Sequence, residues 1–393
     1  MEKQNQEFRL SGTAYFKKQA LVTGIAGLIA TFAGFFIDQT QFFFSYLTAY
    51  MFWLTLVLGA LFFTQLHHIS GADWSIVLRR IIETVMISLP LMAILVIPIL
   101  FGLHDLYHWS HADSVAADPV LLKKSAYLNP VFFTIRVILY FAIWILLARR
   151  LYQTSLAQDA SFQPEQIMKM RKISAPGMIL FALSITFASF DLLMSLDAHW
   201  YSTIFGVYIF GGSFLVILTF IVIFSLYLRK RGILAETITI EHYHDLGKFL
   251  FAFIIFWGYI GFSQYFLIWY ANIPEETIWY LHRWEGSWKI VTMILVFGHF
   301  LIPFIFLMPR FTKRNLSGLR FIAIWIFIMH WIDIYWIVMP NFSHHGVHLS
   351  WIDLTAFLGI GGIFLWYFLN KYYANALVPV SDPRLEISID ITN

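Results

Sequence analysis

The stretch that decides the fold is FASFDLLMSLDAHWYSTIFGVYIFGG, residues 187–212. Two apolar runs meet there through a short polar turn, residues 196–202, so the stretch predicts a helical hairpin. Asp191 lies inside the first apolar run, where an ionisable side chain is costly and marks a pathway or a ligand site. Asp197 and His199 lie in the turn, and they predict a polar mouth near Asp191.

The composition indicates an integral membrane protein. Of the 393 residues, 59% are hydrophobic and only 12% are charged, whereas a soluble domain carries about 25% charged residues. The net charge of +3 gives no argument for a nucleic-acid partner, and the lipid bilayer is the expected surroundings. The absence of cysteine excludes thiolate-ligated iron–sulfur clusters and disulfides within this chain.

Ten apolar runs follow one another with no soluble domain between them, and each approaches the roughly 20 residues that a membrane span needs. The runs cover residues 19–37, 42–66, 80–102, 130–149, 173–195, 203–228, 247–271, 288–308, 318–339 and 350–373. The sequence therefore predicts an all-α polytopic membrane protein with ten transmembrane helices. An N-terminal segment, 1–18, precedes the membrane domain, 19–373, and a polar C-terminal tail, 374–393, is expected to lie peripheral to the fold.

Proline and glycine predict where the spans bend and touch. Kinks are expected at Pro90, Pro98 and Pro303, because proline removes a backbone donor inside a helix. Glycines let two helices approach closely in a membrane, although at each position a lipid-facing glycine is an equal alternative. The candidate positions are Gly24, Gly27, Gly206, Gly211, Gly212, Gly258, Gly261, Gly359, Gly361 and Gly362.

Basic residues predict the orientation. An even number of spans puts both termini on one side, which receives most of the 26 Lys and Arg residues. The positive-inside rule therefore predicts cytoplasmic termini, in the inner membrane of a bacterium, and makes Asp197 and His199 a periplasmic mouth. The periplasmic side keeps only the basic residues Lys123, Lys124, Arg283 and Lys289, but it receives the histidines His104, His108, His111, His199, His282, His344, His345 and His348.

Polar residues inside the spans are placed in depth by the helical rise of about 1.5 Å per residue. The outer half of the membrane receives Arg136, Asp191, Gln264, Asp333 and Asp353. Arg136 is the natural counter-ion for a buried carboxylate, so one interpretation is a set of structural ion pairs and hydrogen bonds. The other interpretation is a proton path or a ligand pocket that opens outward.

Two histidines, His299 and His330, lie deeper, near the middle of the membrane. His330 and Asp333 are three residues apart and share a helix face, an arrangement that suits proton transfer. The two histidines could also ligate one haem axially, although hydrogen-bonded histidines are commoner.

On the cytoplasmic side, polar residues follow the second span. Gln65, His67, His68 and Asp73 are predicted to form a solvated loop, because interfacial polar groups cost little. Glu83, which opens the third span, is the best candidate for an inner proton mouth.

Two outer segments have both a plain and a functional interpretation. The longest outer loop could hold a divalent cation, but a hydrated loop is the simpler interpretation. Its candidate ligands are His104, Asp105, His108, His111 and Asp113. The aromatic stretch 269–280 predicts an ordinary interfacial belt, and stacking on a quinone ring is the alternative.

Several stretches resemble a known family. FDLLMSLDAHWYSTIFGVYIFGGSF, residues 190–214, resembles the signature of the fifth and sixth helices in the NrfD-like family of polysulfide reductase membrane subunits. FSQYFLIWYANIPEET from residue 262, HWIDIYWIVMP from residue 330 and GALFFTQLHHISGADW from residue 59 are similar to it as well. Within that family the chain most resembles the ActF-type subunits of alternative complex III, over most of the second to tenth spans.

The resemblance implies ten helices, with one four-helix bundle from the second to fifth spans, another from the sixth to ninth, and two peripheral helices. It implies a membrane subunit of a respiratory quinol:cytochrome c oxidoreductase, with quinol, such as menaquinol, bound toward the outer face. Iron–sulfur clusters and haem c would belong to partners, namely an iron–sulfur protein, a multihaem cytochrome c and a second NrfD-like subunit. Buried acids and histidines of this chain would form proton half-channels.

The leading hypothesis is therefore a subunit without a redox cofactor of its own, in which Asp191 and Asp333 relay protons beside Arg136. It requires these three side chains to face one another in the outer half of the membrane. One alternative is a secondary transporter, which predicts inverted repeats and broken helices. The other is a haem b-binding cytochrome subunit.

Overall fold

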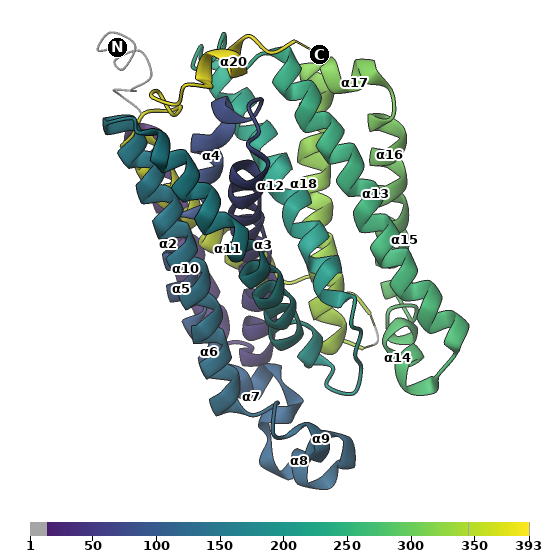
Figure 1. Ribbon diagram of the computed structural model, residues 1–393. Helices are drawn as coiled ribbons and strands as arrows, with labels where there is room; N and C mark the ends of the chain where they lie inside the picture. Colours follow the sequence, from purple (N-terminus) through teal and green to yellow (C-terminus); the bar gives the residue numbers. More distant parts are fainter. Residues whose placement is uncertain (1–13, 345, 393) are drawn as a thin grey trace.

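The computed structural model describes residues 14–344 and 346–392, and in that part of the chain all regular structure is helical (Figure 1). Ten of these helices are long and apolar enough to cross a membrane, which confirms the predicted all-α polytopic membrane fold. Lys3, Arg9 and His345, which contributed to the predicted charge and histidine patterns, lie outside the described residues.

The spans keep the predicted order. The first five are α2 (Ala14–Phe35), α3 (Gln39–Ser70), the segmented helix α4 (Ile76–Met86), α5 (Leu89–Leu95) and α6 (Ile97–Phe101), α10 (Pro130–Ala160) and α11 (Pro164–Leu192). The last five are α12 (Phe205–Lys230), α13 (Ile240–Ala271), the segmented helix α15 (Trp288–Ile294), η3 (Leu295–Leu301) and α16 (Ile302–Leu307), α18 (Leu316–Val338) and α19 (Trp351–Tyr373). The shorter helices include α7 (Leu103–Leu106), α8 (Ala112–Ala117), α9 (Pro119–Lys124), α14 (Pro274–His282), α17 (Arg310–Arg314) and α20 (Leu385–Ile389).

Several helices extend beyond the apolar run that predicted them. α3 continues to Ser70 and α10 to Ala160, in both cases through polar residues. The stop signal of α3 is local: Gly71 adopts a φ of 65° and its N–H donates to the carbonyl of His67. The apolar run therefore marks the part of a helix that crosses lipid, whereas the cap marks its end.

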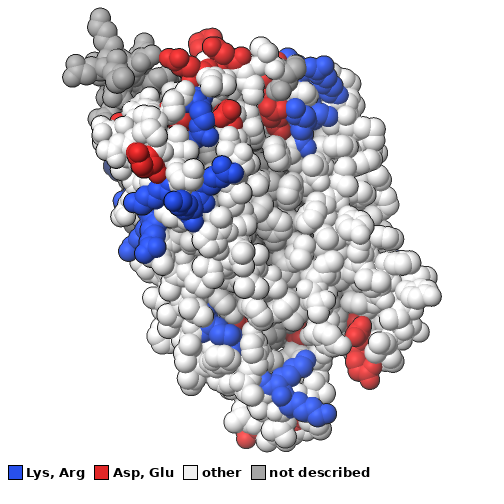
Figure 2. All heavy atoms as spheres, in the orientation of Figure 1, with Lys and Arg blue, Asp and Glu red and all other residues white. Residues whose placement is uncertain are grey.

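The two ends of the molecule differ in charge. We call the end that carries α17 and α20 the basic end, and the end that carries α7–α9 and α14 the loop end (Figure 1). In the view of Figure 2, Lys and Arg side chains gather toward the basic end, and a smaller group lies at the loop end. The start of α2 lies at the same end as the end of α19, because Lys17 stands over the ring of Tyr373.

Two helices form the centre of the molecule. α3 packs against α4, α11, α12, α18 and α19, and 94% of its most apolar stretch is buried. α12 packs against α3, α11, α13 and α18. Helices α3, α4–α6, α10 and α11 thus form one bundle, and α12, α13, α15–α16 and α18 form a second, joined along α3 and α12. α2 and α19 pair with each other at the side.

α2 and α19 approach each other at paired glycines. A Cβ atom on Gly27 would lie 2.6 Å from the backbone nitrogen of Gly359, and one on Gly24 would lie 2.6 Å from that of Ile363. Both separations are too short for non-bonded atoms, so these positions admit only glycine. The predicted close contacts at Gly24, Gly27 and Gly359 are confirmed.

The third and eighth spans deform near the prolines that predicted kinks. Pro90 is the second residue of α5, and Pro98 is the second residue of α6. At this break the carbonyl of Leu95 accepts a hydrogen bond from the Tyr46 hydroxyl of α3, at 2.8 Å. The π-helix η3 directly precedes α16, in which Pro303 is the second residue. A neighbouring helix thus satisfies a carbonyl that the break in the third span frees.

Gly27→Ala is expected to destabilise the protein by about 1–3 kcal/mol, the usual range for overpacking, because the added methyl group would meet the backbone of α19. Thermal unfolding of the full chain in detergent measures the effect. Gly318→Ala is the matched control, since its Cβ would find its nearest neighbour at 3.5 Å. Equal melting temperatures for Gly27→Ala and the unchanged chain would contradict the described contact.

Candidate functional site

The predicted outer set of polar residues does not form one site. Arg136 and Asp191 pair with each other between α10 and α11, whereas Asp333 lies among α12, α13 and α18. The expectation that these three side chains face one another is therefore wrong. Depth along a helix was predicted from the sequence, but the direction in which each helix turns its side chains was not.

Asp191 is fully buried and fully partnered. Its two carboxylate oxygens accept from Nε and Nη2 of Arg136, each at 2.8 Å, and Oδ2 also accepts from the Tyr140 hydroxyl at 2.7 Å. The guanidinium also donates to the carbonyl of Tyr127 and lies 3.7 Å from the centre of its ring. The geometry is that of a bidentate ion pair that ties α10 to α11.

Asp333 is equally buried but has a different kind of environment. Its carboxylate accepts from the Tyr208 hydroxyl of α12 and from Trp257 Nε1 of α13, the latter at 3.2 Å. Both donors are neutral, and Asp333 forms no ion pair within the described part of the chain. A buried carboxylate held by neutral donors can change its protonation state without abandoning a charged partner.

His330 and His299 lie close to this group. Gly212 faces both His330 and Asp333, since a Cβ on that glycine would lie 2.8 Å from His330 Cε1 and 4.0 Å from Asp333 Oδ2. His330 Nε2 lies 2.9 Å from the Thr55 hydroxyl of α3. The ring of His299, on η3, packs against Trp257 with 4.1 Å between ring centres and 34° between the ring planes.

These histidines do not fit a haem. The His330 ring is packed directly against the α12 backbone at Gly212, and its Nε2 is already engaged by Thr55. Neither histidine lines the cavity between α13 and α15 or the groove between α2 and α19. The geometry instead places both imidazoles in the polar group around Asp333.

A cavity of about 850 Å³ lies between α13, α14, α15, η3 and α18, and we call it the aromatic cavity. Tyr208 and Trp257, the two donors to Asp333, form part of its wall. Gln264 also lines it, accepting from Ser202 Oγ and donating to the Tyr280 hydroxyl, each at 2.9 Å. The cavity therefore combines an apolar interior with a few fixed polar groups, as ligand sites do.

Arg283 lines the same cavity, and it forms no ion pair with an acidic side chain of the described residues. It is 2% exposed, and it donates to the carbonyls of Trp336 at 3.1 Å and Ile337 at 2.8 Å, in the last turn of α18. Its guanidinium lies 3.4 Å from the centre of the Trp279 ring. Burial lowers the pKa of Arg283 to about 9. Carbonyls at a helix C-terminus carry partial negative charge, which explains how the fold holds this cation.

Asp353 has a structural task. Its Oδ1 accepts from Ser45 Oγ of α3 at 2.6 Å, and its Oδ2 accepts from the backbone N–H of Ser350 at 2.8 Å. Ser350 and Asp353 form the capping box of α19. The spacing Ser-x-x-Asp before an apolar run is a capping signal that was present in the sequence.

The predicted periplasmic mouth is a docking point for the longest loop. His199 Nε2 lies 2.5 Å from Asp118 Oδ2, and Lys124 donates to the carbonyl of Ala198 at 2.6 Å. The hydrogen bond from His199 lowers the pKa of Asp118. Asp197 accepts from the backbone N–H of His199 at 3.3 Å. The turn after α11 and the α8–α9 loop are thus tied together.

No metal site forms in that loop within the described residues, which contain no group of three or more metal-ligating side chains. His111 Nε2 lies 2.8 Å from the carbonyl oxygen of His104, and the two rings are 3.7 Å apart. The divalent-cation interpretation is therefore not supported by the described residues.

At the basic end, four residues were predicted to form a solvated loop, and this prediction is wrong for three of them. Gln65, His67 and His68 are buried, because α3 continues past its apolar run inside the molecule, where Gln65 faces Gly177 of α11. His67 Nδ1 lies 2.7 Å from Ser75 Oγ. Asp73 alone is exposed.

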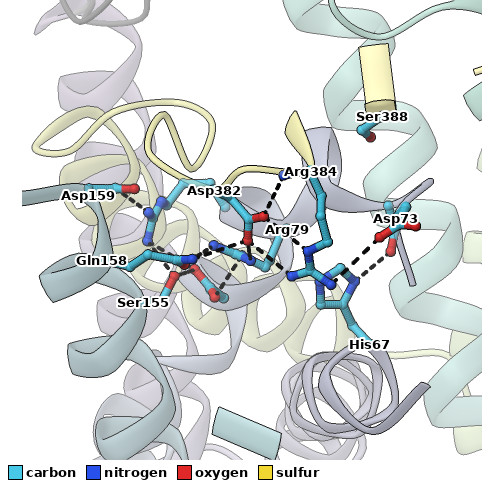
Figure 3. A network of polar contacts seen from close by, with 12 residues as sticks. His67, Asp73, Arg79, Ser155, Gln158, Asp159, Asp382, Arg384 and Ser388 are labelled. Carbon is cyan, nitrogen blue, oxygen red and sulfur yellow. Dashed lines mark hydrogen bonds and ion pairs between the residues drawn. The ribbon is translucent and has the colours of Figure 1, made fainter. Parts of the chain in front are cut away.

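Glu83 belongs to a polar network at this end, and Figure 3 labels its neighbours Arg79 and Ser155. It is fully buried, and its Oε2 accepts from Arg80 at 2.9 Å and from Ser155 at 2.8 Å. Arg79 lies 3.4 Å from its other oxygen and donates to Gln158 at 2.8 Å. Arginines on both sides hold Glu83 as a structural carboxylate, so the structure gives no support for a proton mouth there.

The C-terminal tail is part of this network, which corrects the expectation of a peripheral tail. Asp382 accepts from Arg79 at 2.6 Å and pairs with Arg384 at 3.1 Å (Figure 3). Ser388 of α20 donates to the carbonyl of Trp74 at 2.9 Å. Burial would raise the pKa of Asp382, but the two guanidinium groups outweigh it and lower that pKa to about 2.

Sequence reasoning missed the residues that form the aromatic cavity. Tyr208 and Trp257 were not candidates, and Arg283 was counted only as an outer basic residue. Tyr280 was assigned to an interfacial belt. Trp269 and Tyr270, from the same stretch, are indeed exposed. A basic residue within an aromatic stretch was the one available signal, because a buried cation needs aromatic or carbonyl partners.

No model of a protein family matches the chain, and no curated protein matches it.

Asp191→Asn is expected to destabilise the protein by about 3–5 kcal/mol, because it leaves the buried Arg136 without its counter-charge. The double variant Arg136→Met/Asp191→Leu removes both charges and is expected to recover most of that loss. Thermal unfolding in detergent measures both. A single variant as stable as the unchanged chain would show that the pair does not hold α10 to α11.

Asp382→Asn is expected to lower stability at pH 7 by about 2 kcal/mol, from the fall of the Asp382 pKa from 3.8 to about 2 on folding. Because the folded pKa lies below the unfolded value, this contribution is present above pH 4 and is lost as the pH falls toward 2. Trypsin cleavage after Arg384 at pH 7 reports release of the tail. Asp390→Asn, at an exposed carboxylate, is the control, and equal cleavage of both variants would contradict the docked tail.

Proposed function

We propose that this chain is the membrane subunit of a respiratory quinol-oxidising complex of the NrfD-like type, and that the aromatic cavity takes the quinol. The observation that carries the proposal is the cavity wall, where Tyr208 and Trp257 both donate to the buried Asp333. A quinol needs an apolar space for its ring and tail, and a proton acceptor within reach of its hydroxyl group.

The sequence resemblance supports the same assignment. Three of the four stretches that carry it, 190–214, 262–277 and 330–340, contribute Tyr208, Gln264 and Asp333 in turn. Tyr208 and Gln264 line the cavity, and Asp333 lies behind its wall, where it accepts a hydrogen bond from Tyr208.

The proposed reaction is oxidation of quinol to quinone, which releases two protons and two electrons. Tyr208 takes a proton from a quinol hydroxyl while it passes its own to Asp333, so the tyrosine is unchanged and the carboxylate becomes neutral. Asp333 would release this first proton to the outer side before it takes up the second in the same way. The two electrons would leave to an acceptor held by a partner subunit. This chain supplies binding and proton transfer, and the partners supply the electron acceptors.

Two further polar groups would orient the quinol. The Gln264 amide, fixed between Ser202 and Tyr280, can bond the second hydroxyl. The Arg283 guanidinium lines the same cavity and would stabilise negative charge on the quinol oxygen as its proton leaves. Its other hydrogen bonds fix it in place, so no reorganisation is needed during the reaction.

The proposal includes an orientation. The basic end would face the cytoplasm of a bacterial inner membrane, as the positive-inside rule predicts. The aromatic cavity, which extends to α14 at the loop end, would then release its protons on the periplasmic side. Partner subunits with iron–sulfur clusters and haem c would dock at that end.

A secondary transporter is the second candidate, and the broken third span is the observation that favours it. At this break, however, the Leu95 carbonyl is already satisfied by Tyr46. In transporters of this kind the freed backbone groups bind the ion or substrate. The geometry therefore favours quinol oxidation.

Asp333→Asn is expected to slow quinol oxidation about 10²- to 10⁴-fold, the usual contribution of a positioned proton acceptor, while the quinol still binds. The complex is isolated from native membranes through a tag on this chain, and its subunits are identified by mass spectrometry. Turnover is measured with a reduced quinol, and a photoreactive azidoquinone followed by peptide mapping measures occupancy of the cavity.

Tyr335→Phe is the matched control, because this buried tyrosine of α18 bonds the His348 carbonyl and does not line the cavity. It is expected to leave turnover and labelling unchanged. Labelled peptides should come from α13 and η3. Unchanged turnover in Asp333→Asn, labelling confined to another subunit, or isolation of a homo-oligomer without redox partners would each refute the proposal.

A further inference from the structure

A second cavity lies on the other side of the molecule, and we call it the basic-end groove. It has a volume of about 910 Å³, lies among α2, α3, α12, α18 and α19, and is distinct from the aromatic cavity. Its walls are apolar, with Phe220 and Leu365 among them. Val22 and Leu358 line it and are themselves exposed, so the groove opens on the surface that faces lipid.

The basic-end mouth of this groove carries cations. Lys18 lines the groove directly. Lys17 Nζ lies 5.4 Å from the centre of the Tyr373 ring, and Arg231 Cζ lies 4.7 Å from that of Tyr227, which also lines the groove. None of these three cations forms an ion pair with an acidic side chain in residues 14–344 and 346–392.

The mouth also joins two helices that have little other contact. The ring of Phe16 on α2 lies 5.4 Å from that of Tyr227 on α12, and both line the groove. α2 otherwise packs mainly on α19, and only 28% of its most apolar stretch is buried. A molecule in the groove would contact α2 and α12 of the second bundle at once.

We propose that the basic-end groove binds one anionic phospholipid, with its acyl chains along the groove and its phosphate against Lys17, Lys18 and Arg231. The charge distribution selects this occupant. A partner helix or a quinone tail would cover the apolar wall but leave three cations without a counter-charge. A phospholipid with a net negative headgroup satisfies both features at once, and anionic lipids attract basic residues at the membrane surface.

The test uses the full chain, purified in mild detergent and reconstituted with phosphatidylcholine or phosphatidylglycerol. Native mass spectrometry measures the number of phospholipids retained. The unchanged chain is expected to retain one phosphatidylglycerol and to melt at a higher temperature with that lipid than with phosphatidylcholine. Lys17→Gln/Arg231→Gln is expected to retain phosphatidylglycerol about thirtyfold less tightly, since each basic residue near the surface contributes about 1 kcal/mol.

Two further variants separate the site from general charge effects. Lys123→Gln/Lys124→Gln removes the same charge at the loop end and is expected to keep the bound lipid. Thr23→Trp, at an exposed position that lines the groove, leaves every cation in place and is expected to displace the lipid. Equal retention in the unchanged chain and in Lys17→Gln/Arg231→Gln, no effect of Thr23→Trp, or equal retention of both lipids would overturn the proposal.

Discussion

An acidic side chain inside a membrane has little water to bind, and the buried carboxylates of this protein find their partners in other helices. This constraint decides how the spans of this protein are arranged. Arg136 and Asp191 join α10 to α11, Asp353 joins α19 to α3, and Asp333 joins α18 to α12 and α13. Apolar surfaces alone would allow many relative rotations of these helices. The directional hydrogen bonds of the carboxylates select one rotation.

The nature of the partner separates structural from functional carboxylates. Asp191 and Glu83 are both held by arginines. Neutralising Asp191 would leave the buried Arg136 uncompensated, whereas the two arginines beside Glu83 also pair with Asp382 and Asp159 in the same network. Asp333 is held by a tyrosine and a tryptophan, so its charge can change at a smaller structural cost. Asp333 accepts hydrogen bonds from two residues that line the aromatic cavity, so a change in its charge can be coupled to a ligand there. The proposal therefore rests on Asp333 rather than on Asp191.

The features that depend on the residues of a single helix were predicted correctly from the sequence. The number of spans, the kinks at Pro90 and Pro98 and the glycine contacts of α2 follow from runs of apolar residues and from local stereochemistry. The polar clusters depend on how the helices are rotated about their axes. The depth of Arg136 or Asp333 in the membrane does not reveal this rotation. The tail was predicted to be peripheral because its burial depends on partners such as Arg79, which lie far away in the sequence.

The burial of α3 on nearly all sides has a consequence for biosynthesis. α3 is the second span to leave the ribosome, yet Ser45 and Thr55 bond to Asp353 and His330, which are translated close to the end of the chain. Until then these hydroxyls must rely on their own helix or on the insertion machinery. Assembly of the centre of the molecule is therefore a late event, and a chain truncated before α18 would lack the partners on which its second span is built.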